Sequence, residues 1–105
     1  AFPVEVRVAA ADDIPLSMAG GRETAYIAAH VPAGTDPGPW FAALESIAGE
    51  VAGRPHWGKL HGLDAGVLRG RYPRFGEFTA LRDRLDPAGV FGNAHLDRVL
   101  GPVGG

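Results

Sequence analysis

The 105-residue sequence predicts an α+β fold, in which helices pack on one face of a small antiparallel sheet. Two observations lead to this prediction. Near the N-terminus, apolar and polar residues alternate with the period of two that marks a half-buried strand. Further along, apolar residues recur at helical spacing. No internal repeat, low-complexity tract or linker divides the chain, so we expect one domain with one modest core.

Two strands are predicted in the N-terminal third. Residues 3–9, PVEVRVA, place their valines on one face and their two charged side chains on the other. Residues 11–23 contain Pro15, Gly20 and Gly21 and read as an irregular connection. Residues 24–31, TAYIAAHV, form the second strand, whose alternation places Tyr26 and His30 on one face.

A first helix is predicted from the loop at 32–39 to about residue 52. Asp36 is suited to cap its N-terminus, Pro37 takes the first helical position, and Gly53 ends it. The predicted inward stripe consists of Trp40, Phe41, Leu44, Ile47, Ala48 and Val51.

A second helix is predicted over residues 74–85, where the pair Asp86–Pro87 stops it. Between the two helices a third strand is an option. A short helical turn is expected around residues 94–99. The predicted inward residues of the second helix are Phe75, Phe78, Leu81 and Leu85.

Composition excludes several classes of protein. A net charge of −2 gives no electrostatic reason to expect a nucleic-acid partner. The absence of cysteine excludes disulfides, thiol catalysis and cysteine-ligated zinc. No apolar run reaches the roughly 20 residues of a transmembrane helix. We therefore expect a soluble, cytoplasmic protein.

Three polar residues of the strands are candidates for chemistry. Glu5 and Arg7, two residues apart, share a face and lie about 7 Å apart along the strand. They form either a surface ion pair or a carboxylate and guanidinium presented together to a polar ligand. If the strands pair, His30 joins that face; its alternative is an ordinary surface histidine.

Residues 54–64, RPHWGKLHGLD, form the densest polar stretch and contain the only lysine of the chain. The spacing of His56 and His61 matches neither a helical zinc pair nor a zinc finger, so we expect no metal site. In one interpretation Trp57 packs on the preceding helix and the polar residues bond within turns. In the other, Lys59 is a cation placed where negative charge develops.

Three segments together resemble a known family: VEVRVAAADDIPLS (4–17), RPHWGKLH (54–61) and RYPRFGEFTALRDRLDPAGVFGNAHLDRVLG (71–101). In this order they are similar to the C-terminal part of FAD-linked sugar-1,4-lactone oxidases (D-arabinono- and L-gulono-1,4-lactone oxidases) and alditol oxidases, of the vanillyl-alcohol-oxidase fold group. The H-W-x-K-x-H element resembles the lactone oxidases and dehydrogenases more than the alditol oxidases.

The resemblance implies that residues 1–105 are the C-terminal part of a substrate (cap) domain, with residues 86–105 as its return segment. The FAD-binding domain would then be absent, as in a cloned domain or a proteolytic remnant. The parent would oxidise a CH–OH group of a sugar-1,4-lactone, or alternatively a polyol, by hydride transfer to flavin N5. The alternative hypothesis is that the chain is a non-catalytic binding module.

The resemblance also implies roles for individual residues. Glu5, His30 and His61 would contact substrate, while Arg7 and Lys59 would be catalytic and face the flavin N1/C2=O edge. Reduced flavin gains negative charge there, which fixed cations favour. We expect the fragment alone to bind no FAD tightly, to be inactive, and to self-associate through apolar surface that its FAD-binding domain would cover.

Overall fold

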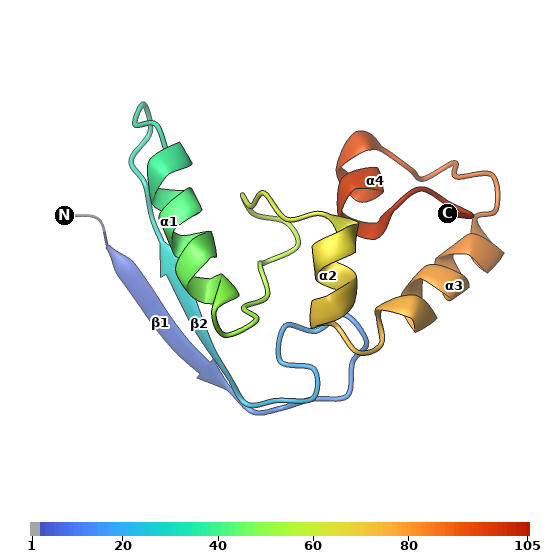
Figure 1. The fold of residues 1–105 in the computed structure, drawn as a ribbon, viewed down its shortest axis with the longest axis horizontal. Helices are drawn as coiled ribbons and strands as arrows, with labels where there is room; N and C mark the ends of the chain where they lie inside the picture. Colours follow the sequence, from blue (N-terminus) through green and yellow to red (C-terminus); the bar gives the residue numbers. More distant parts are fainter. Residues whose placement is uncertain (1–2) are drawn as a thin grey trace.

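The computed structural model describes residues 3–105, which form a two-stranded sheet followed by four helices (Figure 1). The sheet and the first helix lie at one side of the molecule, and the other three helices lie together at the opposite side (Figure 1). Among residues 3–105, none of the helices combines the length and the apolar character that a membrane span requires. The elements are β1 (Val4–Ala9), β2 (Thr24–Ala29), α1 (Gly38–Gly49), α2 (Ala65–Arg71), α3 (Phe75–Leu85) and α4 (Ala94–Leu100).

The two strands pair antiparallel, as the sequence predicts, with Glu5 opposite Ala28 and Arg7 opposite Tyr26. Their connection is long but ordered by one side chain. The Asp12 carboxylate accepts hydrogen bonds from the backbone N–H of Ile14 at 3.0 Å and from the Ser17 hydroxyl at 2.5 Å. Short polar side chains commonly stabilise turns in this way.

The sheet is covered on the face opposite to the one that its apolar pattern indicates. Val4, Val6 and Val8 are 60%, 64% and 83% exposed, whereas Tyr26 and Ala28, on the Glu5 face, are half-buried. Within residues 3–105, the half-buried strand that the alternation predicts is therefore covered on its Glu5 face and not on its valine face. Alternation shows that a strand has two different faces, but it does not show which of them other elements of the same chain cover.

Helix α1 begins close to its predicted start and ends earlier. Pro37 occupies the N-cap position, and the Asp36 carboxylate accepts a hydrogen bond from the Gly38 N–H at 3.0 Å. The chain leaves the helix after Gly49 and turns through Ala52, which has a φ of 52°. Gly53 therefore does not end the helix as predicted. The position requires glycine because a Cβ there would lie 2.7 Å from the Cβ of Ala48.

No residue of α1 is fully buried. The predicted inward stripe of this helix is wrong for three of its six residues. Phe41, Leu44 and Ala48 are half-buried. The other three stripe residues are more than half exposed: Trp40 at 51%, Ile47 at 65% and Val51 at 73%.

Helix α2 replaces the optional third strand. Its N-cap is Asp64, whose carboxylate accepts a hydrogen bond from the Val67 N–H at 3.1 Å. The segment AGVLRGR contains two glycines and is short, so its helical propensity is low. Tertiary packing stabilises it instead, because Leu68 is fully buried.

The core lies among the last three helices, not under the sheet. It consists of Leu68, Tyr72, Phe75, Val99 and Leu100. Helix α3 contributes to it mainly through its N-terminal end: Phe75 is buried, but Phe78, Leu81 and Leu85, also predicted to point inward, are 38%, 43% and 73% exposed. These three side chains line an open apolar groove between α3 and α4.

Candidate functional site

The paired strands bring three predicted site residues together. The Arg7 Nε donates to the Glu5 Oε1 in a short ion pair, and the His30 Nε2 lies 3.6 Å from the Glu5 Oε2. His30 reaches Glu5 because its backbone N–H donates to the Pro3 carbonyl, which extends the strand register by one pair. We call Glu5, Arg7 and His30 the strand triad.

The electrostatics of the strand triad keep its carboxylate ionised. The hydrogen bond and the charge of Arg7 lower the pKa of Glu5, and His30 adds smaller contributions in the same direction. All three side chains remain open to solvent: 76% of Arg7, 40% of Glu5 and 55% of His30 is exposed. The triad can therefore offer a carboxylate acceptor beside a guanidinium to a polar molecule.

Lys59 and His61 lie apart from the strand triad, in the connection between α1 and α2. No hydrogen bond or ion pair among residues 3–105 joins either of them to Glu5, Arg7 or His30. The Lys59 side chain is exposed, and its ammonium group has no hydrogen-bond or ion-pair partner in this range. Within residues 3–105, Lys59 is thus a cation presented to the outside of a turn.

The two histidines on either side of Lys59 bond within the turn. The Nδ1 of His56 accepts a hydrogen bond from the Gly58 N–H at 3.0 Å, and that of His61 accepts one from the Leu63 N–H at 3.2 Å. Burial lowers the pKa of His61, and the nearby Arg98 charge lowers it further. The His61 Nε2 is buried and has no hydrogen-bond partner in the described part of the chain.

Trp57 and Arg54 anchor the start of the same connection. The Trp57 ring lies over the Tyr72 ring with centroids 5.0 Å apart, and its Nε1 donates to the Leu16 carbonyl at 2.9 Å. Trp57 thus packs against the core residue Tyr72. The Arg54 guanidinium also lies over the Tyr72 ring, 4.8 Å from its centroid, and donates to the Gly20 carbonyl at 2.8 Å.

Three further residues hold the connection, and sequence reasoning missed all of them. The Glu45 carboxylate of α1 accepts from the Gly62 N–H. From α4, His95 bonds the Trp57 carbonyl, and Arg98 bonds those of His61 and Leu63. No local pattern could have indicated these contacts, because the partners of His95 and Arg98 lie more than thirty residues away in the sequence.

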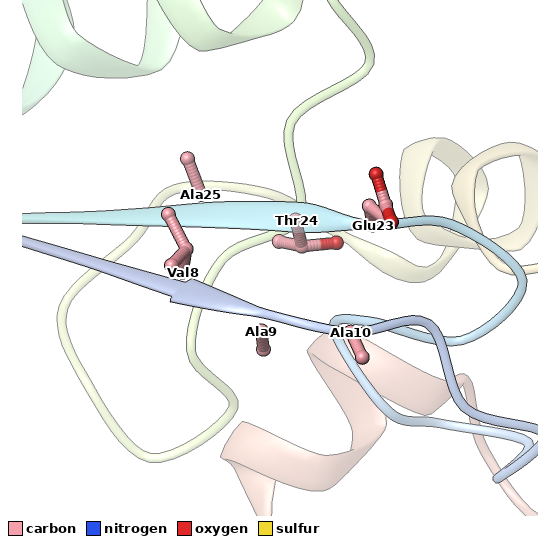
Figure 2. Close-up of a pocket in the computed structure, with 6 residues that line it drawn as sticks. All are labelled: Val8, Ala9, Ala10, Glu23, Thr24 and Ala25. Atoms are coloured by element: carbon pink, nitrogen blue, oxygen red, sulfur yellow. The ribbon is translucent and has the colours of Figure 1, made fainter.

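A separate hollow lies at the opposite end of the sheet and contains none of the predicted site residues. Figure 2 shows Val8 and Ala25 extending to one side of the strands there and Ala9 to the other. Its only charged lining residue is Glu23. Across residues 3–105, no three His, Asp or Glu side chains gather in a way that could hold a metal ion.

Comparison with known proteins gives consistent matches along the chain. The sequence model of a family described as D-arabinono-1,4-lactone oxidase matches residues 1–99. An L-gulono-1,4-lactone dehydrogenase of Mycobacterium tuberculosis is 54% identical over 101 residues, covering 96% of this chain. The L-gulonolactone oxidase of Bos taurus is 41% identical over 103 residues (94% of this chain), and an alditol oxidase of a Streptomyces species is 39% identical over 99 residues (91%).

The matched region is a minor part of each of these relatives. It covers 24% of the mycobacterial dehydrogenase and 23% each of the bovine and Streptomyces oxidases. The chain thus spans about a quarter of the length of the relatives that it matches.

Proposed function

This chain belongs to the D-arabinono-1,4-lactone oxidase family, and we propose that it is the C-terminal part of the substrate (cap) domain of an FAD-dependent oxidoreductase. Residues 86–105 would form its return segment. The parent would oxidise a CH–OH group of a sugar-1,4-lactone. The observation that carries the proposal is the strand triad, in which Glu5, Arg7 and His30 meet on one face of the sheet.

The chemistry of the strand triad suits a polyhydroxylated substrate. A carboxylate accepts hydrogen bonds from hydroxyl groups, and the lowered pKa of Glu5 keeps it in that form at neutral pH. His30, at 3.6 Å from Glu5, adds a ring nitrogen at the edge of the same surface. We assign substrate binding to Glu5 and His30, and, from the resemblance of the H-W-x-K-x-H element at residues 56–61, also to His61.

The two cations of the proposed site fit a flavin. Arg7 and Lys59 are both exposed, and Lys59 has no carboxylate beside it among residues 3–105. FAD, bound mainly outside this chain, would supply a hydride acceptor. Arg7 and Lys59 would face its N1/C2=O edge, where fixed positive charge favours the reduced form.

A lactone is favoured over a linear polyol as substrate. The mycobacterial lactone dehydrogenase is 54% identical to this chain, whereas the Streptomyces alditol oxidase is 39% identical. Oxidation of an alditol is the alternative activity and would use the same residues.

The test is flavin reduction in the whole protein that contains this chain. Under anaerobic conditions, stopped-flow absorbance would follow flavin bleaching by L-gulono-1,4-lactone, D-arabinono-1,4-lactone and xylitol. We expect Lys59→Ala and Arg7→Ala each to slow reduction by about a hundred- to a thousandfold, as for loss of one group that stabilises developing negative charge. Glu5→Gln should mainly raise the substrate concentration required.

The matched control is Arg84→Ala, which removes an exposed arginine that makes no hydrogen bond or ion pair to a described residue. It should leave the reduction rate unchanged. Unaltered reduction in both Lys59→Ala and Arg7→Ala would overturn the assigned roles. A whole protein that carries no flavin, or whose flavin none of the three substrates reduces, would overturn the proposed function.

A further inference from the structure

The backbone around Lys59 is bonded on both sides by one helix. The Nε2 of His95 lies 3.2 Å from the carbonyl oxygen of Trp57, two residues before Lys59. The Nη1 of Arg98 donates to the carbonyls of His61 at 3.1 Å and Leu63 at 2.6 Å, two and four residues after it. Both side chains belong to α4, so a single rigid element spans residues 56–63, which we call the Lys59 turn.

The hydrogen bonds of His95 and Arg98 are mutually consistent. The Trp57 carbonyl can only accept, so the His95 Nε2 carries the ring proton and its Nδ1 is an acceptor. The Nη2 of Arg98 lies 3.4 Å from that Nδ1 and can donate to it. Arg98 therefore orients His95 while it bonds the far end of the Lys59 turn, and the two side chains act as one unit.

Helix α4 is itself held firmly. Val99 and Leu100 are buried in the core, and the Asn93 side chain caps the helix by accepting from the Leu96 N–H at 2.9 Å. The face of α4 with His95 and Arg98 is exposed apart from its contact with the Lys59 turn. His95 and Arg98 thus connect the Lys59 turn to a helix that the core holds in place. The turn itself contributes no fully buried residue.

We propose that His95 and Arg98 are positioning residues that fix the backbone of the Lys59 turn, and through it the place of the Lys59 ammonium. This inference rests on the proposed function for the role of Lys59. A guanidinium can serve two carbonyls at once, whereas an ammonium at the end of a lysine side chain has no such planar fork. Charge-assisted bonds of this kind are the stronger class of hydrogen bond in proteins.

The first arm of the test uses the 105-residue chain and needs no flavin. Amide hydrogen exchange by NMR would compare the wild type, Arg98→Ala, His95→Phe and the control Arg84→Ala. We expect exchange at the hydrogen-bonded amides of Gly58, Lys59 and Gly62 to rise about tenfold in Arg98→Ala, as when a charge-assisted hydrogen bond is lost. Exchange at the core residues of α2 should stay unchanged. Equal protection of the turn in all four proteins would overturn the proposal.

The second arm is a double-mutant cycle in the whole flavoprotein, read as the rate of flavin reduction. Arg98→Ala should slow reduction about ten- to a hundredfold when Lys59 is present, because a small displacement of a catalytic group is costly. It should have almost no further effect in a Lys59→Ala background. Arg98→Lys should recover less than half of the decrease in the logarithm of the reduction rate that Arg98→Ala causes. Equal effects in both backgrounds would show that Arg98 does not act through Lys59 and would overturn the proposal.

The two arms distinguish a failure of the positioning role from a failure of the proposed function. If Lys59→Ala alone leaves reduction unchanged, the proposed role of Lys59 is wrong, and the exchange arm still decides whether α4 fixes the turn. If Lys59→Ala slows reduction but Arg98→Ala changes neither exchange nor rate, the positioning role is wrong and the proposed function stands.

Discussion

At the scale of single residues, His61 shows how one contact sets the chemistry of a ring. Its Nδ1 accepts from the Leu63 N–H, so in the neutral ring the proton lies on Nε2, which is buried and lacks a partner in the described residues. Protonation would place the second proton on Nδ1, where the Leu63 N–H would lose its acceptor, and would put a positive charge on a partly buried ring near Arg98. The folded chain therefore favours neutral His61.

We predict that His61 titrates below the usual histidine value and couples pH to stability. The lowered pKa follows first from burial, then from Arg98 and His95, with Glu45 opposing them. As pH falls below about 6.5, the unfolded chain takes up a proton that the folded chain does not. The contribution of neutral His61 to the free energy of unfolding is therefore fully present above that pH. It is lost as the pH falls towards the lowered pKa of His61 in the folded state.

Urea unfolding of the 105-residue chain between pH 7.5 and 5 would measure this effect. The free energy of unfolding should decrease more steeply in the wild type than in His61→Phe, which has no group to titrate at this position. NMR of the His61 ring would report its pKa directly. Identical slopes in the two proteins, or a ring pKa above 6.5, would contradict the prediction.

At the scale of elements, the two shortest helices depend on their caps. Both α2 and α4 have seven residues, which is too short for a helix to be stable by itself. Each begins at a side chain that accepts from a backbone N–H of the first turn, Asp64 for α2 and Asn93 for α4. The core residues that these helices carry are placed only if the helices form.

Asn93→Ala should therefore reduce the free energy of unfolding by about 0.5–2 kcal/mol. The physical reason is the loss of the acceptor for the Leu96 N–H at the start of α4. Urea unfolding followed by circular dichroism would measure the change. Ser46→Ala, at an exposed position inside α1, is the matched control and should cost nothing, since alanine favours a helix. An Asn93→Ala protein as stable as the wild type would contradict the prediction.

At the scale of the whole molecule, two apolar surfaces stay open within residues 3–105. One is the valine face of the sheet, with Ile27 at 58% exposed beside the valines of β1. The other is the groove between α3 and α4, next to Phe91 at 81% exposed. Each strand pairs only with the other in this range, so each also keeps an unpaired edge. Such surfaces and edges favour association.

We predict that the 105-residue chain self-associates as its concentration rises. Val6→Lys and Val8→Lys place a charge on the valine face and should shift the equilibrium towards monomer. Sedimentation velocity over a range of concentrations would measure the shift. The control Arg84→Lys, which keeps its charge and lies on α3, should associate as the wild type does. A wild type that stays monomeric at high concentration would contradict the prediction.

The sequence by itself determined the elements whose signals are local. Alternation over residues 4–8 identifies β1, helical spacing with Asp86–Pro87 identifies α3, and the strand period places Glu5, Arg7 and His30 on one face once the strands pair. These features depend on neighbours a few residues apart, and side-chain chemistry acts at that range without help from the rest of the fold.

Only the tertiary structure decided which surfaces meet. The fold leaves the valine face exposed and stabilises α2 despite its two glycines. It also packs Trp57 against Tyr72 and places His95 and Arg98 against the Lys59 turn. Each of these outcomes joins residues far apart in the sequence or depends on what covers a surface. Periodicity can show that a surface is apolar, but burial is a relation between two surfaces, and the partner is chosen only when the chain folds.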